Sequence, residues 1–365
     1  MPQNIQLTRE QVIFLSFLGA IGNIVYIHTW IDDYTGRAAW VAGLLGILFV
    51  IPFAVWIFYL GKFQPQSTVF DILERCLGKF PNMAIIVIFI LLNITIAVAH
   101  LNMFTQMINA FFLGTTPPWI IMLILILICV MFAYGEIKVF GRLVEILAAF
   151  GIINYFAAFI FAPKLFHIEY VIPVFDTSLT GFIKGSIFML GGAAEVLLIF
   201  MVIVRNIPDS GKHYMWVVKG IALSSVIFSF AIMIIIGIMS PELAKRIAFG
   251  GVNAAKLIQA GKFLQGLEIF IFGTYQIIAI GKITVSMYCA WTAVKKIFNK
   301  KPLLQLIIIA LMMLIPSIWL GSYNKAYFLA VFLASYIILP FSVLTLLLAS
   351  ISVLITNKRA GSATK

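Results

Sequence analysis

Long apolar stretches separated by short polar connections recur along the whole chain. A helix needs about 20 residues to cross the hydrocarbon layer of a bilayer, and about ten stretches approach or exceed that length. They lie near residues 11–30, 40–60, 83–113, 119–134, 143–163, 183–204, 216–239, 264–294, 303–320 and 327–355. The pattern predicts an all-α integral membrane protein with one transmembrane domain over residues 1–365.

Composition supports this interpretation and argues against an enzyme. Of the 365 residues, 63% are hydrophobic and only 10% are charged, which is more apolar surface than a water-soluble core can bury. The connections are too short for a catalytic domain, no Gly-rich phosphate loop follows a strand, and no His or Cys cluster has metal-ligand spacing. The sequence therefore predicts a protein that is not an enzyme and that has no cofactor and no metal.

The net charge of +12 follows the predicted topology. Basic residues gather in alternate connections: Lys62, Arg75, Lys79, Lys138, Arg142, Arg205, Lys212, Lys219, Lys295, Lys296, Lys300, Lys301, Lys358 and Arg359. The positive-inside rule places these connections and both termini in the cytoplasm. One predicted outer connection is an exception, because it carries Lys245, Arg246, Lys256 and Lys262. The basic surplus indicates contact with acidic lipid and not a nucleic-acid site.

Two connections have the pattern of short helices. Residues 67–79 begin with a candidate Ser cap and carry apolar residues at helical spacing, which predicts an interfacial helix on the cytoplasmic side. Residues 240–263 begin with Ser-Pro-Glu and break at Gly250 and Gly251, which predicts a helix pair across the outer mouth. Solvated linkers are the alternative for both.

Glycines interrupt the first and the sixth predicted spans at similar depths. Gly19 and Gly22 lie in the first span, and Gly191 and Gly192 lie in the sixth. A repeat of five spans must invert in the membrane, and interrupted helices at corresponding positions of inverted halves indicate a transporter-type site. We therefore predict a five-plus-five inverted repeat, near 9–164 and 181–356, with discontinuous first and sixth helices. Close helix packing is the alternative explanation of these glycines.

Two charged residues lie near the middle of predicted spans. Glu195 follows the second glycine pair, and Lys282 lies in the eighth span. A charge at the centre of a span costs at least about 2.5 kcal/mol and is a functional hypothesis by default. Snorkelling of Lys282 to the interface remains the alternative.

Polar residues on two other spans extend the candidate site. In the third span, Thr95 shares a helical face with Val98, whereas Asn93 and His100 lie on the other side; in the eighth, Thr284 and Tyr288 lie on the face opposite Lys282. The candidate ligand-binding set is Gly19, Gly22, Asn23, Thr95, Val98, Gly191, Gly192, Ala193, Val196, Thr284 and Tyr288. Such walls suit a small, partly apolar ligand. Interhelical hydrogen bonding is the alternative for the polar members.

An ordered set of segments resembles one known family. The set comprises LTREQVIFLSFLGAIGNIVY, AAWVAGLL, KFQPQSTVFDILERCLGKF, LAKRIAFGGVNAAKLIQAGKFLQGLEIFIF and GKITVSMYCAW. It resembles the B subunits of nutrient germinant receptors, the endospore germination permeases. The resemblance implies a LeuT-like fold of the amino acid/polyamine/organocation transporter superfamily. It also implies binding of a small nutrient, often an amino acid, beside an A subunit and a lipoprotein C subunit in the inner membrane of a bacterial spore.

The resemblance gives Lys282 a specific role. Sodium-coupled relatives of that fold hold a cation between the first and eighth helices, where this chain has a lysine. The Lys282 ammonium is therefore expected to replace the ion, to donate hydrogen bonds to carbonyls around Gly19 and Ala20, and to make sensing independent of sodium. Glu195 is either its counter-charge or a residue across the pocket.

Two other functions fit the same sequence. An autonomous proton-coupled amino acid transporter would use the same pocket and the same intramembrane charges. A structural scaffold with a vestigial pocket would explain the glycines by packing alone.

Overall fold

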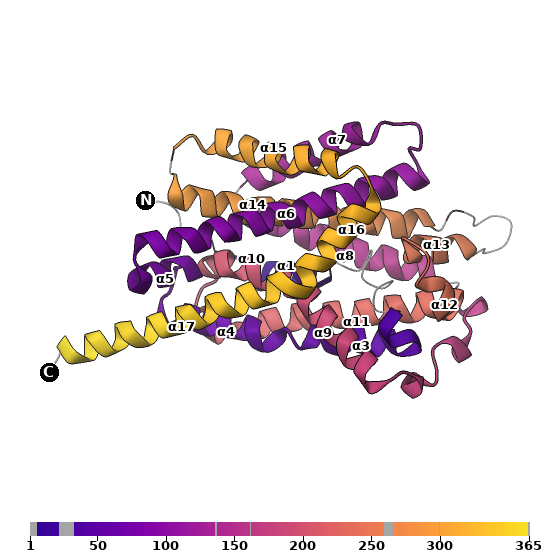
Figure 1. Ribbon diagram of the computed structural model, residues 1–365, viewed down its shortest axis with the longest axis horizontal. Coiled ribbons are helices and arrows are strands. Elements are labelled where there is room, and N and C mark those ends of the chain that lie inside the picture. The colour runs from indigo at the N-terminus through magenta and orange to yellow at the C-terminus, as the bar shows by residue number, and fades with distance from the viewer. Residues whose placement is uncertain are drawn as a thin grey trace.

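The computed structural model describes residues 6–21, 33–135, 137–160, 162–258, 266, 268–298 and 300–363. Within these ranges the regular elements are all helices, most of them aligned along one long axis (Figure 1). The α-helices are α1 (Arg9–Ile21), α3 (Ala39–Leu48), α4 (Ile51–Phe63), α5 (Val69–Leu77), α6 (Lys79–Phe111), α7 (Pro118–Tyr134), α8 (Ile137–Phe159), α9 (Leu179–Ala193), α10 (Glu195–Ile203), α11 (Tyr214–Met239), α12 (Pro241–Ala244), α13 (Gly250–Leu257), α14 (Glu268–Ile297), α15 (Pro302–Leu320), α16 (Tyr323–Phe332) and α17 (Ile338–Ala363).

Seven helical stretches of the described chain are long and apolar enough to cross a bilayer. They are Asp33–Phe63, Lys79–Phe111, Leu179–Asn206, Tyr214–Met239, Glu268–Ile297, Pro302–Leu320 and Tyr323–Thr356. Of the other three predicted stretches, the described part of the first (residues 11–21) lies in α1, and the remaining two coincide with α7, a shorter apolar helix, and α8. The prediction of an all-α integral membrane protein is confirmed.

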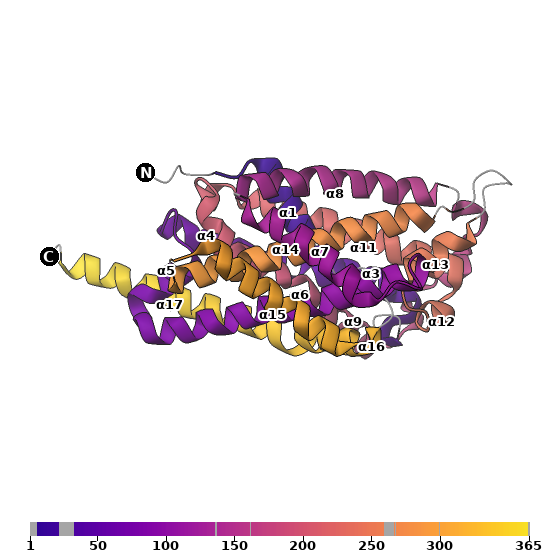
Figure 2. The same ribbon diagram turned by 90° about the horizontal axis from the view of Figure 1, so that it is seen from above.

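The outer surface of the bundle is apolar over long distances. Helix α8 exposes Ile146, Phe150 and Ile153, and α15 exposes Leu304, Ile308 and Leu311. Figure 2 shows α8 along one edge of the molecule and α15 close to the opposite edge. A surface of this kind is stable where lipid tails, and not water, surround it.

Helix α10 is the centre of the packing. All nine of its residues are buried, and α1, α4, α5, α14 and α17 contact it. A helix that is apolar on every side requires such complete enclosure. Gly19 allows α1 to come close, because a Cβ there would lie 2.9 Å from Val196 Cγ2 and 3.0 Å from Val196 Cα.

The sixth segment is less interrupted than the sequence predicts. Gly191 and Gly192 both lie inside α9, so the prediction that they are unwound is wrong. The break is a single turn at Ala194, whose N–H still donates to the Leu190 carbonyl at 2.9 Å. Gly191 serves close packing instead, because a Cβ there would overlap the carbonyl oxygen of Ala334 in the π-helical turn η7 (Leu333–Ile337). In the first segment, Gly22 and Asn23 lie outside the described residues.

Two short helical segments lie at opposite ends of the bundle (Figure 1). Helix α5 occupies the segment predicted to form an interfacial helix, with Thr68 as its cap instead of Ser67. The backbone N–H of Asp71 donates to Thr68 Oγ1 at 3.2 Å, and that of Thr68 donates to Asp71 Oδ2 at 2.7 Å. This reciprocal pair needs a side-chain acceptor at the third residue after the cap. Asp71 occupies that position when Thr68 is the cap. Helices α12 and α13 lie at the other end, within the 240–263 segment.

Candidate functional site

Lys282 of α14 lies at the meeting point of the first, sixth and eighth segments. Its side chain is 1% exposed. Its ammonium donates one hydrogen bond to the Gly19 carbonyl oxygen at 3.0 Å and another to the Glu195 carboxylate, with which it forms an ion pair. Gly19 lies near the end of the described part of α1, and its carbonyl oxygen accepts this bond from another helix. The contact predicted between Lys282 and the first-span carbonyls is therefore present, and Glu195 is the direct counter-charge.

The carboxylate of this pair lies at the junction of two helices. Glu195 is the first residue of α10, directly after the turn at Ala194 that separates α10 from α9. Both charges are buried, and removal of one partner would leave the other without compensation in an apolar interior. The Lys282–Glu195 pair therefore holds α14 against α10 only while both groups are present.

Polar side chains from α6 and α14 surround the pair. The pair lines a cavity of about 10 Å³, together with Asn93, Ile96, Leu198, Ile199, Val285 and Ser286. His100 is near enough to interact electrostatically with both charged groups, and its Nδ1 lies 2.9 Å from the Ile96 carbonyl oxygen. A signal for these neighbours exists in the sequence, because Asn93, Ile96 and His100 share one face of α6 and Ser286 lies one turn after Lys282.

Other members of the predicted pocket lie elsewhere. Val98 and Thr95 are on the opposite face of α6, where the Val98 carbonyl accepts a bond from Ser317 Oγ of α15 at 3.0 Å. Thr284 is buried beside Cys129 of α7. Tyr288 stacks on Phe140 near the end of α14, with ring centroids 6.5 Å apart. The structure therefore brings Gly19, Val196, Glu195 and Lys282 together but places Thr95, Val98, Thr284 and Tyr288 apart from them.

The remaining predicted residues belong to the packing around the pair. Gly191, Gly192 and Ala193 are buried in the last turn of α9, one turn before Glu195. Val196 contacts the backbone of α1 at Gly19. They fix the position of the first turn of α10, and with it the position of the carboxylate.

Comparison with known proteins identifies the family. The sequence profile of the family described as Spore germination protein matches residues 6–326. The chain belongs to this family. It is 19% identical to the spore germination protein YndE of Bacillus subtilis (strain 168) over 295 residues, 80% of each chain. It is 26% identical to the spore germination protein KB of the same organism over 275 residues, which cover 73% of this chain and 72% of that one.

The family match agrees with the resemblance found in the sequence. A further relative, the spore germination protein B2 of Bacillus subtilis (strain 168), is 21% identical over 240 residues, 64% of each chain. The profile match includes α1, α10 and α14, so Gly19, Glu195 and Lys282 all lie within the part of the chain that the family shares.

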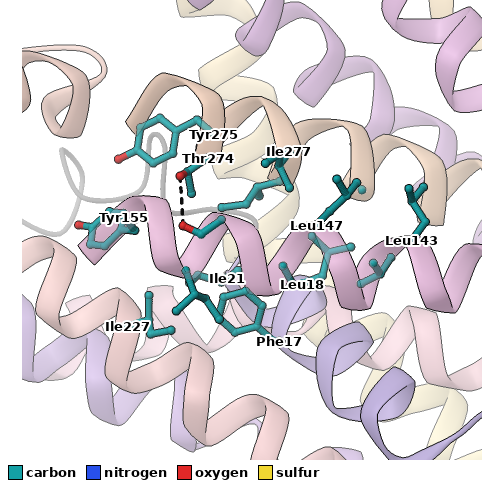
Figure 3. A pocket seen from close by; sticks show the side chains of 16 residues that line it. Phe17, Leu18, Ile21, Leu143, Leu147, Tyr155, Ile227, Thr274, Tyr275 and Ile277 are labelled. Atoms are coloured by element: carbon teal, nitrogen blue, oxygen red, sulfur yellow. Dashed lines mark hydrogen bonds between the residues drawn. The ribbon is translucent and has the colours of Figure 1, made fainter. Parts of the chain in front are cut away.

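This spore germination protein has a second, apolar cavity near the pair. Helices α1, α8, α11 and α14 enclose about 30 Å³ between side chains that include Phe17, Leu18, Leu147 and Ile227 (Figure 3). The Thr274 hydroxyl closes one side by donating to the Gly151 carbonyl at 3.2 Å. The cavity reaches Gly281, the residue before Lys282. Sequence patterns give no signal for it, because its walls are ordinary core residues from four separate helices.

Proposed function

We propose that this spore germination protein is the nutrient-binding subunit of a spore germinant receptor, that its nutrient is an amino acid, and that binding triggers germination. One observation carries the proposal. In a member of the spore germination protein family, three separate segments meet at a buried lysine that is bonded to a carbonyl of α1 and to the carboxylate of α10. Buried charges of this kind mark ligand or ion sites in membrane proteins.

The architecture that we propose is the five-plus-five inverted repeat. A shift of five spans should convert each helix contact into another contact of the same structure. The contact of α1 with α11 corresponds in this way to that of α9 with α3, and the contact of α6 with α15 corresponds to that of α14 with α7. The contact of α1 with α8 corresponds to that of α9 with η7, and the pairs α3–α11 and α6–α14 correspond to themselves. These equivalences support the repeat and a site between its halves.

An amino acid matches the chemistry of the pair. Its carboxylate and ammonium are the same two charges as Glu195 and Lys282, so the ligand can exchange partners with them without leaving a buried charge uncompensated. The cavity of about 10 Å³ beside the pair is smaller than an amino acid. Binding therefore requires α1 or α14 to move away from α10, and this movement is the signal that we propose for the rest of the receptor.

The proposal includes location and partners. The chain acts in the spore inner membrane, with both termini on the cytoplasmic side and beside an A subunit and a lipoprotein C subunit. Lys62, Arg205, Lys212, Lys295 and Lys296 gather at one end of the bundle, here called the basic end, which supports that orientation. The described connections are short, so any output beyond ligand binding is assigned to the partners.

Lys282→Met tests the proposal, because it removes the charge at a similar length. We expect thermal-shift screening of the purified wild-type protein against single amino acids to find at least one that stabilises it. The Lys282→Met variant should lose that stabilisation and, in spores with matched protein levels, the germination response, although the uncompensated Glu195 carboxylate lowers its unfolding temperature without ligand. Equal stabilisation of variant and wild type, or a wild-type response that requires sodium, would contradict it.

Uptake by membrane vesicles separates this function from transport. Vesicles that contain only this chain should accumulate no labelled amino acid. Accumulation that depends on a proton gradient would favour the autonomous transporter.

A further inference from the structure

A large cavity opens at the basic end, away from the Lys282–Glu195 pair. The ends of α4, α7 and α14, the start of α8 and the 3₁₀ turns η5 (Val204–Asn206) and η6 (Ser210–Lys212) line a cavity of about 670 Å³. This volume is within the range of small-molecule sites. A second cavity of about 410 Å³ adjoins it, and both are lined by Arg205, Tyr288 and Lys295. We call the larger one the basic cavity.

The wall of the basic cavity has more positive than negative groups. It carries four cationic side chains, Lys62, Arg205, Lys212 and Lys295, and one carboxylate, Asp209. Asp209 is paired with Lys212 at 3.4 Å. Among the described residues, no carboxylate lies within ion-pair distance of Lys62, Arg205 or Lys295. Arg205 and Lys295 both line the cavity and are near enough to interact electrostatically, so an anion between them would be attracted by both.

Aromatic packing and helix geometry position the two central cations. The Lys295 Nζ lies 3.4 Å from the ring centroid of Trp291 and 6.0 Å from that of Tyr288. Trp291 is itself fixed, because its Nε1 donates to the Pro302 carbonyl oxygen at 3.0 Å. Arg205 follows the C-terminal end of α10, where the helix dipole favours a cation. Lys295 is therefore held at the cavity wall before any ligand binds, and a positive charge is favoured at the position of Arg205 beside it.

We propose that the basic cavity binds a polyvalent phosphate anion between Arg205 and Lys295. The planar guanidinium provides two parallel donors for phosphate oxygens, and the lysine adds a second positive charge. The rings of Tyr288 and Trp291 offer an apolar wall for the body of a phosphate ester. A lipid headgroup offers the same phosphate chemistry from a different source.

The bound anion couples to the buried pair through two rigid helices. Helix α10 runs from Glu195 to just before Arg205, about 15 Å away, and α14 carries Lys282 and Lys295 about 20 Å apart. The two helices thus attract each other at the pair and repel each other at the basic cavity. An anion that bridges the cations removes this repulsion, and it stabilises the arrangement in which the pair is closed.

Binding of inorganic pyrophosphate tests this site without any nutrient. The full chain in nanodiscs of neutral phosphatidylcholine is titrated with pyrophosphate in a calorimeter, and saturable binding is expected. Arg205→Gln and Lys295→Gln should each weaken binding at least about tenfold, since each removes a charge-assisted bond. Lys300→Gln is the matched control, because Lys300 is an exposed lysine at the same end that does not line the cavity. It should bind within about twofold of wild type.

Several outcomes would overturn the site. They are the absence of saturable binding to wild type, and an equal loss of affinity in Lys300→Gln and Arg205→Gln. A further test needs no variant and therefore remains valid if the variants fail to fold. Pyrophosphate should raise the unfolding temperature of the wild-type protein, whereas sodium chloride of equal ionic strength should not. Equal effects of the two salts would also contradict the proposal.

Nanodiscs that contain phosphatidylglycerol identify the source of the phosphate. Unchanged pyrophosphate affinity in these nanodiscs supports a soluble anion. A lower pyrophosphate affinity caused by competition from the lipid supports a headgroup in the same site, provided that Arg205→Gln abolishes the competition. None of these readouts depends on a nutrient. Failure of the proposed function is therefore distinguishable from failure of this site.

Discussion

At the residue scale, Gly19 and Lys282 show which parts of a membrane site are visible in a sequence. The two intramembrane charges stand out because their burial is costly, and the structure pairs them. Their neighbours could not be selected in the same way. Each of the helices α6 and α14 has two polar faces, and periodicity does not say which face meets the sixth segment. The choice of Val98 and Thr284 instead of Asn93 and Ser286 reflects that ambiguity.

Gly19→Ala tests whether close approach of α1 to α10 supports the pair. The added Cβ would lie 3.0 Å from Val196 Cα, a backbone atom that cannot rotate away. We expect a loss of about 1–3 kcal/mol in the free energy of unfolding, measured by thermal unfolding in detergent. Gly273→Ala in α14 is the control, because nothing lies within 4 Å of its Cβ position. Its stability should stay equal or rise by about 0.5–1 kcal/mol. Equal effects of the two substitutions would refute the role of Gly19.

At the element scale, helix existence could be predicted well and helix ends less well. The short helix α5 follows from its apolar spacing, but its cap depends on Asp71, which the choice of Ser67 ignored. The glycines of the sixth segment predict unwinding, whereas both lie inside α9, and Gly191 leaves room there for a carbonyl of the tenth span. That carbonyl comes from a residue far away in the sequence, so no local pattern reveals it.

The ion pairs between α5 and α14 give a pH-dependent prediction. Lys296 Nζ lies 2.5 Å from Asp71 Oδ1 and 3.0 Å from Glu74 Oε2. Burial alone would raise the pKa of Asp71, but the hydrogen bonds from Lys296 and Thr68 outweigh it and hold that pKa below its usual 3.8. The carboxylate therefore stabilises α5 docking above about pH 4, and this contribution is lost as the pH falls through the lowered pKa.

Hydrogen exchange of residues 67–79 measures this docking. We expect faster exchange near pH 3 than near pH 7, after correction for intrinsic rates. In Lys296→Met the pH dependence should weaken, with a loss of no more than about 1 kcal/mol because the pair is partly exposed. Lys300→Met, at the same end, should behave as wild type. An unchanged pH dependence in Lys296→Met would show that the ion pairs do not hold α5.

At the scale of the whole molecule, spans could be predicted from hydropathy, but cavities could not. The basic cavity is assembled from segments between Gln6 and Lys295, and its shape depends on how the helices pack. The proposed orientation in the membrane is a different case, because it rests on charge placement. Helices α4 and α5, the start of α6 and the end of α17 share one end of the bundle with the basic cavity (Figure 1). Basic residues near span ends favour retention of that end in the cytoplasm.

Thiol labelling tests this orientation with residues that the chain already has. Cys76 is partly exposed on α5 at the basic end, whereas Cys129 and Cys289 are buried. A membrane-impermeant maleimide should therefore label the wild-type chain only after intact cells are permeabilised. Glu169→Cys in a Cys76→Ala background places an exposed thiol in the turn η3 (Ile168–Tyr170), between α8 and α9, and should react in intact cells. The opposite pattern would invert the orientation. It would also place the basic cavity on the outer side. Lys245 and Lys256 of the predicted outer connection would then lie on the cytoplasmic side.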